Sequence, residues 1–324
     1  MAGAVSFAAA TRVAAQPAAT KRLAIVDVSN SASKMQADSP NLYRILFSEL
    51  RRFGHIEGQN LTVDRYGSEQ KLPDLTALAA QVVSSNPDVV YALTPGGLTF
   101  KTVTSKVPVV AVTGDPVASG LIQSLAHPGG NITGVSVDAG PSVHGKRIAL
   151  LREMFPAMSK LACIAGRYHW TSGAGDQVRS AAEAAGIPLV SVLVDLPGNA
   201  KIYRDAIAQA AREGSDAIMM LDNPDVFANS VSIAESFADA RIPAIHAFER
   251  TVDAGGLMAY AFDLKELIKR VAADIDVILR GGNPADIPFY QLSKFELSIN
   301  LKTAKALGLT VPTALLASAD KVIE

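Results

Sequence analysis

The chain has 324 residues, of which 49% are hydrophobic, so it is long enough to bury two cores of ordinary domain size. Its 30 Lys and Arg residues nearly balance its 31 Asp and Glu residues without long runs of either sign, which argues against a nucleic-acid or anionic-membrane partner. The single cysteine, Cys163, excludes a disulfide framework, and we expect it to be a small buried hydrophobic residue.

Residues 1–20 are rich in Ala, lack acidic residues and offer small residues at Ala14, Ala15 and Ala18 where a signal peptidase could cut. A basic start and a long apolar core are missing, so we interpret the segment as the remnant of a secretory signal or as a flexible arm. It predicts export to the periplasm. No other window reaches the roughly 20 apolar residues of a membrane span.

The first 137 residues alternate short apolar runs with amphipathic segments, which is typical of a parallel α/β sheet. The run at 89–93 is continuously apolar, as in a parallel strand buried on both faces. We expect strands at residues 22–28, 61–66, 89–93, 108–112 and 132–137, and helices at residues 41–53, 74–84 and 98–105.

The same alternation begins again in the second half of the chain, which predicts a second α/β unit. The long amphipathic segment 264–279 is interpreted as a helix that packs back on the first unit. We expect strands at residues 161–165, 189–194, 217–221, 244–247 and 294–300, a crossing between the units at residues 257–260, and helices at residues 145–155, 175–185, 200–212, 226–240, 264–279, 302–307 and from 312.

These elements predict an α/β fold with two doubly wound parallel-sheet lobes arranged as a clamshell. The first lobe would comprise residues 21–137 and 262–290, and the second lobe residues 138–261 and 291–324, with residues 1–20 outside both. Open α/β sheets bind ligands at the carboxyl ends of their strands, and two such lobes can close on a ligand by a hinge motion.

Sequence motifs for common chemistry are missing. The chain has no phosphate-binding G-x-x-x-x-G-K-[ST] loop, no dinucleotide fingerprint after its first strand and no G-x-S-x-G nucleophile turn. Its five His residues are scattered singly without metal-ligand spacing. We therefore predict no catalytic residue, no metal and no cofactor.

The candidate ligand-binding residues follow the expected strands. The turn 94–97 can present backbone N–H groups to a carboxylate, and Asp115 or Asp222 can accept an ammonium group, which together suit an amino acid. Aromatic rings near the cleft would pack on its side chain, although the Asp-Pro sequences are also ordinary turns and helix caps. The candidates are Asn30, Ser31, Thr94, Gly96, Asp115, Ser136, Asp222, Phe248 and Tyr260, with Tyr168 and Trp170 as further aromatic candidates.

Four stretches carry a resemblance to a known family: 114–121 with 127–134, 145–153, 254–260 and 294–309. The chain resembles the ABC-transporter substrate-binding protein family of the type that includes tryptophan- and tyrosine-binding lipoproteins, which have the type I periplasmic binding protein fold. The similarity extends from residue 21 to the C-terminus. Gly114, Ala261 and the loop 166–170 depart from the family pattern near the expected pocket.

The resemblance implies an exported receptor that captures a small solute in the cleft between its lobes and delivers it to a membrane permease without chemical change. An amino acid or similar small carboxylate is the expected ligand, and a monomer is the expected state. Two alternatives remain: a cytoplasmic ligand-sensing domain of the same fold, and a two-lobed racemase-type enzyme. The racemase would require two acid/base residues facing each other, such as a Cys pair, and only Cys163 is present.

Overall fold

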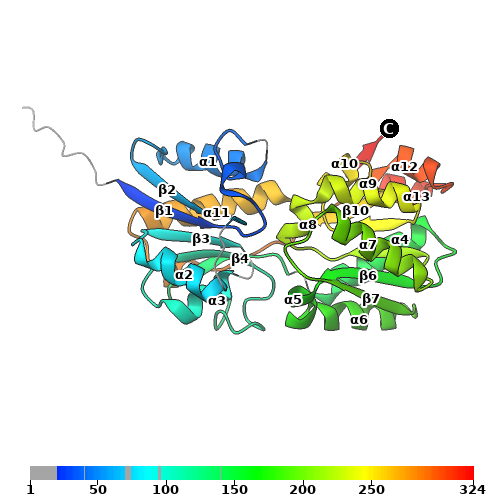
Figure 1. The fold of residues 1–324 in the computed structure, drawn as a ribbon, viewed down its shortest axis with the longest axis horizontal. Helices are drawn as coiled ribbons and strands as arrows, with labels where there is room; N and C mark the ends of the chain where they lie inside the picture. The colour runs from blue at the N-terminus through cyan, green and yellow to red at the C-terminus, as the bar shows by residue number, and fades with distance from the viewer. Residues whose placement is uncertain (1–19, 40, 70–73, 94–95, 139) are drawn as a thin grey trace, which may run out of the picture.

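The computed structural model describes residues 20–39, 41–69, 74–93, 96–138 and 140–324. It contains a six-stranded and a seven-stranded sheet, and each sheet carries its own helices (Figure 1). We call the six-stranded sheet with its helices the first lobe and the seven-stranded sheet with its helices the second lobe. The predicted α/β class with two doubly wound lobes is confirmed.

The first sheet has the strand order β11-β5-β4-β3-β1-β2, and all its neighbouring strands are parallel. The chain winds outward from β1 in both directions, which is the doubly wound pattern. β11 is the strand of this sheet that sequence patterning missed, because two residues are too short for a periodic signal. The strands are β1 (Lys21–Val26), β2 (Leu61–Tyr66), β3 (Val89–Leu93), β4 (Val109–Thr113), β5 (Ile132–Ser136) and β11 (Tyr290–Gln291).

Helices cover both faces of this sheet because successive strand side chains point to opposite sides. Leu23 and Ile25 of β1 belong to the core under α1 and α11, whereas Ala24 and Val26 belong to the core under α2 and α3. α11 comes late in the sequence and returns to lie beside α1 (Figure 1). The helices are α1 (Leu42–Arg52), α2 (Leu75–Ser84), α3 (Gly96–Val103), α11 (Leu264–Leu279) and the short 3-10 helices η1 (Ala32–Lys34) and η3 (Pro284–Asp286).

The second sheet has the order β13-β12-β10-β9-β8-β6-β7 and is parallel except for the pair β10–β12. β12 runs the other way because the chain enters it directly from β11 of the first lobe, on the side where the other strands end. The strands are β6 (Leu161–Gly166), β7 (Leu189–Val194), β8 (Ala217–Met220), β9 (Ala244–His246), β10 (Met258–Phe262), β12 (Phe295–Asn300) and β13 (Lys321–Ile323). Cys163 of β6 is fully buried, as predicted.

The expected single helix at 226–240 is wrong, since two helices, α8 and α9, occupy this region. Asn223 caps α8 with Pro224 in its first turn, and the break follows at Asn229, whose amide donates to the carbonyl of Asp225. The second-lobe helices are α4 (Pro141–Met154), α5 (Arg167–His169), α6 (Gly175–Ala184), α7 (Ala200–Arg212), α8 (Pro224–Ala228), α9 (Ser230–Ala240), α10 (Glu249–Asp253), α12 (Leu301–Ala306), α13 (Thr313–Ala317) and the π-helical turn η2 (Trp170–Ala174).

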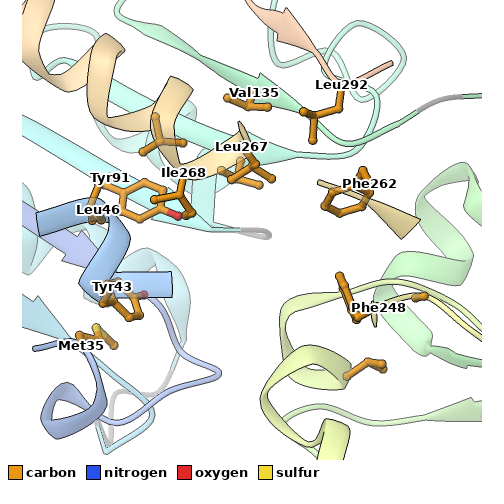
Figure 2. Close-up of a cluster of buried hydrophobic side chains, with 14 of the residues drawn as sticks. Met35, Tyr43, Leu46, Tyr91, Val135, Phe248, Phe262, Leu267, Ile268 and Leu292 are labelled. Atoms are coloured by element: carbon orange, nitrogen blue, oxygen red, sulfur yellow. The ribbon is translucent and has the colours of Figure 1, made fainter. Parts of the chain in front are cut away.

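Three connections join the lobes: β5 to α4, β10 to α11, and β11 to β12. One cluster of buried apolar side chains extends over both lobes beside these connections, with Phe248 and Phe262 on one side and Leu267 and Ile268 of α11 on the other (Figure 2). The rings of Phe248 and Phe262 meet edge to face, with 6.0 Å between their centroids. The carboxyl ends of the parallel strands in the two sheets therefore face one another across this region.

Candidate ligand-binding site

A cavity of about 530 Å³ lies between the lobes, lined by residues that follow strands of both sheets. Its size falls within the range of about 300–1,000 Å³ that is typical of small-molecule sites. The first lobe contributes residues after β1 and β4 together with β3 and α11, and the second lobe contributes residues of α4 and residues after β6, β8 and β9. The cavity thus occupies the position where open α/β sheets bind ligands.

The first-lobe wall is built around Asp27, which is buried at the carboxyl end of β1. Its carboxylate accepts hydrogen bonds from the backbone of Ser29 at 3.0 Å, the amide of Asn30 at 2.8 Å and the hydroxyl of Tyr43 at 2.6 Å. Burial, followed by the charge of Asp27, raises the pKa of Tyr43, which keeps its phenol neutral as a donor. Asp27 therefore has its polar partners within its own lobe.

The remainder of the first-lobe wall combines polar residues, among them Lys34 and Ser119, with an apolar part. Tyr91 of β3 and the α11 residues Leu267 and Ile268 line the cavity, and Figure 2 shows them on the side opposite Phe248. Burial and then the charge of Asp27 raise the pKa of Tyr91, so this ring also stays neutral. Such a surface suits the apolar body of a ligand.

The second-lobe wall holds a buried ion pair between Arg147 of α4 and Asp222, which follows β8. Arg147 Nη1 donates to Asp222 Oδ1 at 2.9 Å, and Arg147 Nε donates to the carbonyl of Tyr260 at 3.0 Å. The Arg147 side chain is 1% exposed and that of Asp222 is 19% exposed. Burial by itself would raise the pKa of Asp222, but Arg147, His144 and the hydrogen bonds to the carboxylate together outweigh burial and lower that pKa below its usual value. Asp222 is consequently charged at neutral pH.

Two further polar side chains of this wall hold buried atoms without a hydrogen-bond partner among the described residues. They are Nδ1 of His144, in the first turn of α4, and Nδ2 of Asn223, directly after Asp222. Burial, and secondarily the charge of Arg147, lowers the pKa of His144 to about 4, so its ring is neutral at pH 7. Asn223 uses its other amide atom, Oδ1, to cap α8 by accepting from the backbone of Val226 at 2.9 Å.

Aromatic rings continue from this wall to the connections between the lobes. Phe227 and Phe248 meet edge to face at 5.4 Å, and Phe262 and Phe295 do so at 6.1 Å. All four line the cavity. Edge-to-face pairs hold each other in fixed orientations. The cavity consequently has a rigid aromatic surface next to its polar second-lobe wall.

Four of the residues predicted from sequence line the cavity: Asn30, Asp115, Asp222 and Phe248. Asn30 donates to Asp27, and Asp222 is paired with Arg147. Asp115 Oδ1 caps a turn by accepting from two backbone N–H groups, those of residues 117 and 118, each at 2.9 Å. The ordinary turn role that the sequence left open for Asp115 is therefore present in the structure.

Four others lie beside the cavity without lining it. Ser31 precedes η1 and its hydroxyl bonds to that of Ser33, while Ser136 Oγ donates to the carbonyl of Gly114. Gly96 begins α3, and Tyr260 of β10 stacks its ring on Phe295, with 5.4 Å between the centroids, while its carbonyl supports Arg147. The ninth candidate, Thr94, lies outside the described residues.

Of the two further aromatic candidates, Tyr168 lines the cavity. Trp170 does not, because its ring is buried in the second-lobe core, with the guanidinium of Arg179 5.1 Å from its ring. Trp170 is therefore part of the second-lobe core and does not line the cavity.

Sequence reasoning missed Arg147, His144 and Asn223. A signal for Arg147 was present, since Leu150, Leu151 and Met154 follow it at positions three, four and seven, which places a charge on the buried face of a helix. Asn223 was interpreted only as part of a turn. The structure shows that Asn223 caps α8 through Oδ1 and also lines the cavity, with its Nδ2 left without a partner among the described residues.

The described residues give little support for a metal site or a catalytic thiol. No group of three or more His, Cys, Asp or Glu side chains in them is placed to hold a metal ion. Burial raises the pKa of Cys163 to about 12, which makes this thiol unsuited to proton transfer near neutral pH. None of the helices in the described ranges has the length and apolar character needed to cross a membrane.

The fold and the cavity define a two-lobed α/β binding protein. The family model described as ABC transporter substrate binding protein matches residues 42–323, so the chain belongs to this family. The family resemblance found in the sequence is thereby confirmed.

Individual relatives agree with this assignment. The tyrosine-binding protein of Clostridioides difficile strain R20291 is 27% identical over 264 residues, which are 79% of this chain and 73% of that protein. A conserved domain protein of Vibrio cholerae has a TM-score of 0.81 at 24% identity, covering 94% of this chain and 99% of that one. The ABC domain of Streptococcus pneumonia in complex with L-Trp has a TM-score of 0.80 at 22% identity, covering 94% and 100%. The two solved structures share the fold of this chain.

Proposed function

We propose that this protein is the periplasmic receptor of an ABC import system and captures an amino acid or similar small carboxylate between its lobes. The observation that carries the proposal is the cavity of about 530 Å³ between the lobes, which is lined by both apolar and polar side chains. Such a surface suits a small solute with one apolar and one polar end. The receptor would deliver this solute to a membrane permease without changing it chemically.

Membership of the substrate-binding family supports this proposal. Support for an amino acid comes from two similar proteins, one described as tyrosine-binding and one solved in complex with L-Trp. Both ligands carry a carboxylate on an aromatic body. The aromatic lining of the cavity in this chain fits ligands of that general shape.

Binding would proceed by closure of two lobes, residues 21–137 with 262–290 and residues 138–261 with 291–324, around the three connections. A ligand that touches both walls stabilises the closed arrangement over the open one, which shifts the population of the receptor. The closed monomer would then dock on the permease. Because each wall contributes separate contacts, neither lobe alone would hold the solute tightly.

A thermal-shift screen tests this function. The purified protein would be melted with amino acids, including tryptophan and tyrosine, with small carboxylates and with purines. A ligand at 100 times its Kd adds about 2.7 kcal/mol to the free energy of unfolding and raises the melting temperature by several degrees. A shift with amino acids or carboxylates supports the proposal, whereas stabilisation by purines alone would leave a receptor with a different ligand class. No shift with any solute would contradict the receptor function.

A further inference from the structure

The carboxylates that line the cavity already have hydrogen-bond donors. Asp27 receives three, Asp115 receives two backbone N–H groups, and Asp222 receives the guanidinium of Arg147. The fourth, Asp138, accepts from the backbone of residue 140 at 2.6 Å and from the side-chain amide of residue 177 at 3.2 Å. A ligand ammonium group would therefore compete with a protein donor at each of these four positions.

The second-lobe wall offers donors instead. Asn223 is 4% exposed, and its Nδ2 has no partner among the described residues. Leaving a buried donor unpaired is unfavourable, so a ligand acceptor at this point would relieve the cost. Asn223 Oδ1 accepts the hydrogen bond that caps α8, which fixes the orientation of the amide. Nδ2 is therefore the atom of this amide that remains able to donate to a ligand.

Arg147 adds a second donor on the same wall. Its Nε and Nη1 are used within the protein, and a guanidinium has five N–H donors in a planar arrangement that matches a carboxylate. His144, from the same helix, contributes another buried nitrogen without a partner among the described residues. Residues with unpaired buried atoms, on two separate elements, α4 and the segment after β8, thus line one side of the cavity.

We infer that this wall is a carboxylate subsite, in which Asn223 Nδ2 and the guanidinium of Arg147 donate to the ligand carboxylate. Asp222 acts as a positioning residue for Arg147 and does not receive a ligand ammonium group. The inference rests on the proposed function and specifies its ligand as a carboxylate with an aromatic or apolar body, for which an α-ammonium group is unnecessary. The body would lie against Tyr91, Phe248 and Phe262.

Matched ligands test this inference on the unmodified protein. Isothermal titration would compare 3-phenylpropionate with L-phenylalanine and 2-phenylethylamine, and indole-3-propionate with L-tryptophan and tryptamine. We expect each acid to bind no more weakly than its amino acid and at least about tenfold more tightly than its amine. If the amino acids bind at least about tenfold more tightly than the acids, or if the amines bind as well as the acids, the inference is overturned while the receptor function stands.

The variant Asn223→Asp tests the proposed donor directly. Asp caps helices as well as Asn does, so α8 is preserved while the N–H₂ group becomes an oxygen that repels a carboxylate. We expect the affinity for the acids to fall at least about tenfold. Asn199→Asp is the matched control, because Asn199 caps α7 of the same lobe outside the cavity lining and the change in charge is identical. Its affinity should stay within about twofold of the wild-type value.

The results of these experiments distinguish a failure of the carboxylate subsite from a failure of the proposed receptor function. Equal affinities of the Asn223→Asp and Asn199→Asp variants for the acids would overturn the carboxylate subsite. Absence of binding by all six compounds would also overturn it, whereas a hit among other solutes in the thermal-shift screen would retain the receptor. Asp222→Asn gives an independent check, since a positioning role predicts an equal fractional loss for acids and amino acids. A selective loss for amino acids would assign Asp222 to the ammonium group instead.

Discussion

The two walls of the cavity differ in how a carboxylate is stabilised: Asp27 by neutral hydrogen-bond donors and Asp222 by a cation. Asp27 in the first lobe accepts hydrogen bonds from neutral donors of its own lobe. In the second lobe Asp222 is neutralised by the buried cation of Arg147, and neighbouring polar atoms are left without partners. The first wall also holds a buried hydroxyl without a partner among the described residues, that of Ser119, but the second wall places its unpaired atoms, on His144 and Asn223, beside a buried cation.

This difference indicates a division of roles between the lobes. The apolar side chains of the first wall contribute contact area to many ligands and discriminate weakly among their polar groups. A wall with buried, unpaired polar atoms rejects ligands that cannot satisfy those atoms, so it determines specificity. We therefore expect changes in the second lobe to alter which ligand is bound and changes in the first lobe to alter stability and general affinity.

The largest effect is expected from Arg147→Met, which leaves Asp222 buried without its cation. Breaking one side of a buried pair costs about 3–5 kcal/mol in the free energy of unfolding, and we expect this loss in urea denaturation together with loss of carboxylate binding. Arg52→Met is the control, because Arg52 is 65% exposed in its pair with Glu49, and it should cost no more than about 1 kcal/mol.

A double variant, Arg147→Met with Asp222→Leu, sharpens this test because no unpaired charge remains. It should recover much of the lost stability while remaining unable to bind the carboxylate. Recovery of both stability and binding would contradict the assignment of Arg147 to the ligand.

A second prediction contrasts the titration of buried carboxyl groups in the two lobes. Asp274 of α11 is 2% exposed, and burial raises its pKa to about 7 even though Arg270 lies 3.0 Å away and lowers it. Because the folded-state pKa lies above the ordinary value of 3.8, its contribution to stability is full below about pH 4 and is lost as the pH rises through about 7. Asp222 behaves oppositely, since its lowered pKa gives a contribution that is present above the ordinary value and is lost as the pH falls through the folded-state pKa.

Asp274→Asn should consequently stabilise the protein at pH 8 but not at pH 4, by no more than about 4 kcal/mol, the equivalent of the shift from 3.8 to about 7. Urea denaturation at the two pH values measures this difference. Asp239→Asn, on the exposed face of α9, is the matched control and should give the same small effect at both values. Equal effects of Asp274→Asn at pH 4 and pH 8 would show that Asp274 titrates normally.

A smaller effect is expected from Tyr43→Phe, which removes the hydroxyl that donates to Asp27 at 2.6 Å. Loss of a donor to a buried carboxylate should cost about 1–3 kcal/mol in urea denaturation. Tyr66→Phe is the control in the same lobe, since this hydroxyl makes only a weak contact of 3.5 Å with Ser85. If the two variants lose equal stability, the hydrogen bond from Tyr43 to Asp27 contributes no more to the free energy of unfolding than the contact of Tyr66 with Ser85. The preference for acids over amines should be unchanged in both, because the first wall does not set it.

The smallest effect is expected from Asp115→Asn. Asn accepts the same two backbone hydrogen bonds and caps turns and helices about as well as Asp, so stability should change by less than about 0.5 kcal/mol. Binding of 3-phenylpropionate and L-phenylalanine, measured by titration, should keep its ratio. A selective loss of L-phenylalanine binding would identify Asp115 as the receiver of an ammonium group.

Local patterns in the sequence were enough to predict most of the fold. The structure reproduces the expected bounds of β3 and α11, because one is a continuous apolar run and the other a long amphipathic period. The break between α8 and α9 was missed, because it depends on a side-chain hydrogen bond at Asn229 that leaves the apolar periodicity unchanged. β13 was missed because three residues carry no periodic signal.

The sequence predicted where the cavity lies, but it predicted only some of the residues that line it and not how they are paired. Asn30, Asp115, Asp222 and Phe248 follow strands, and the rule that parallel sheets bind at their carboxyl ends places them at the cavity. The role of Arg147 depends on partners that lie 75 and 113 residues away, Asp222 and Tyr260. No local pattern indicates such a distant pairing, so the sequence suggested Asp222 as a free carboxylate when it is paired.

A crystal structure of the protein with the tightest-binding compound of the six tests the central claim most directly. We predict that the ligand occupies the cavity with its carboxylate at about 3 Å from Asn223 Nδ2 and within reach of the Arg147 guanidinium, and with its body against Tyr91 and Phe248. A ligand bound outside the cavity, or one held in the cavity by its ammonium group on Asp222 with its carboxylate on the first lobe, would contradict the account.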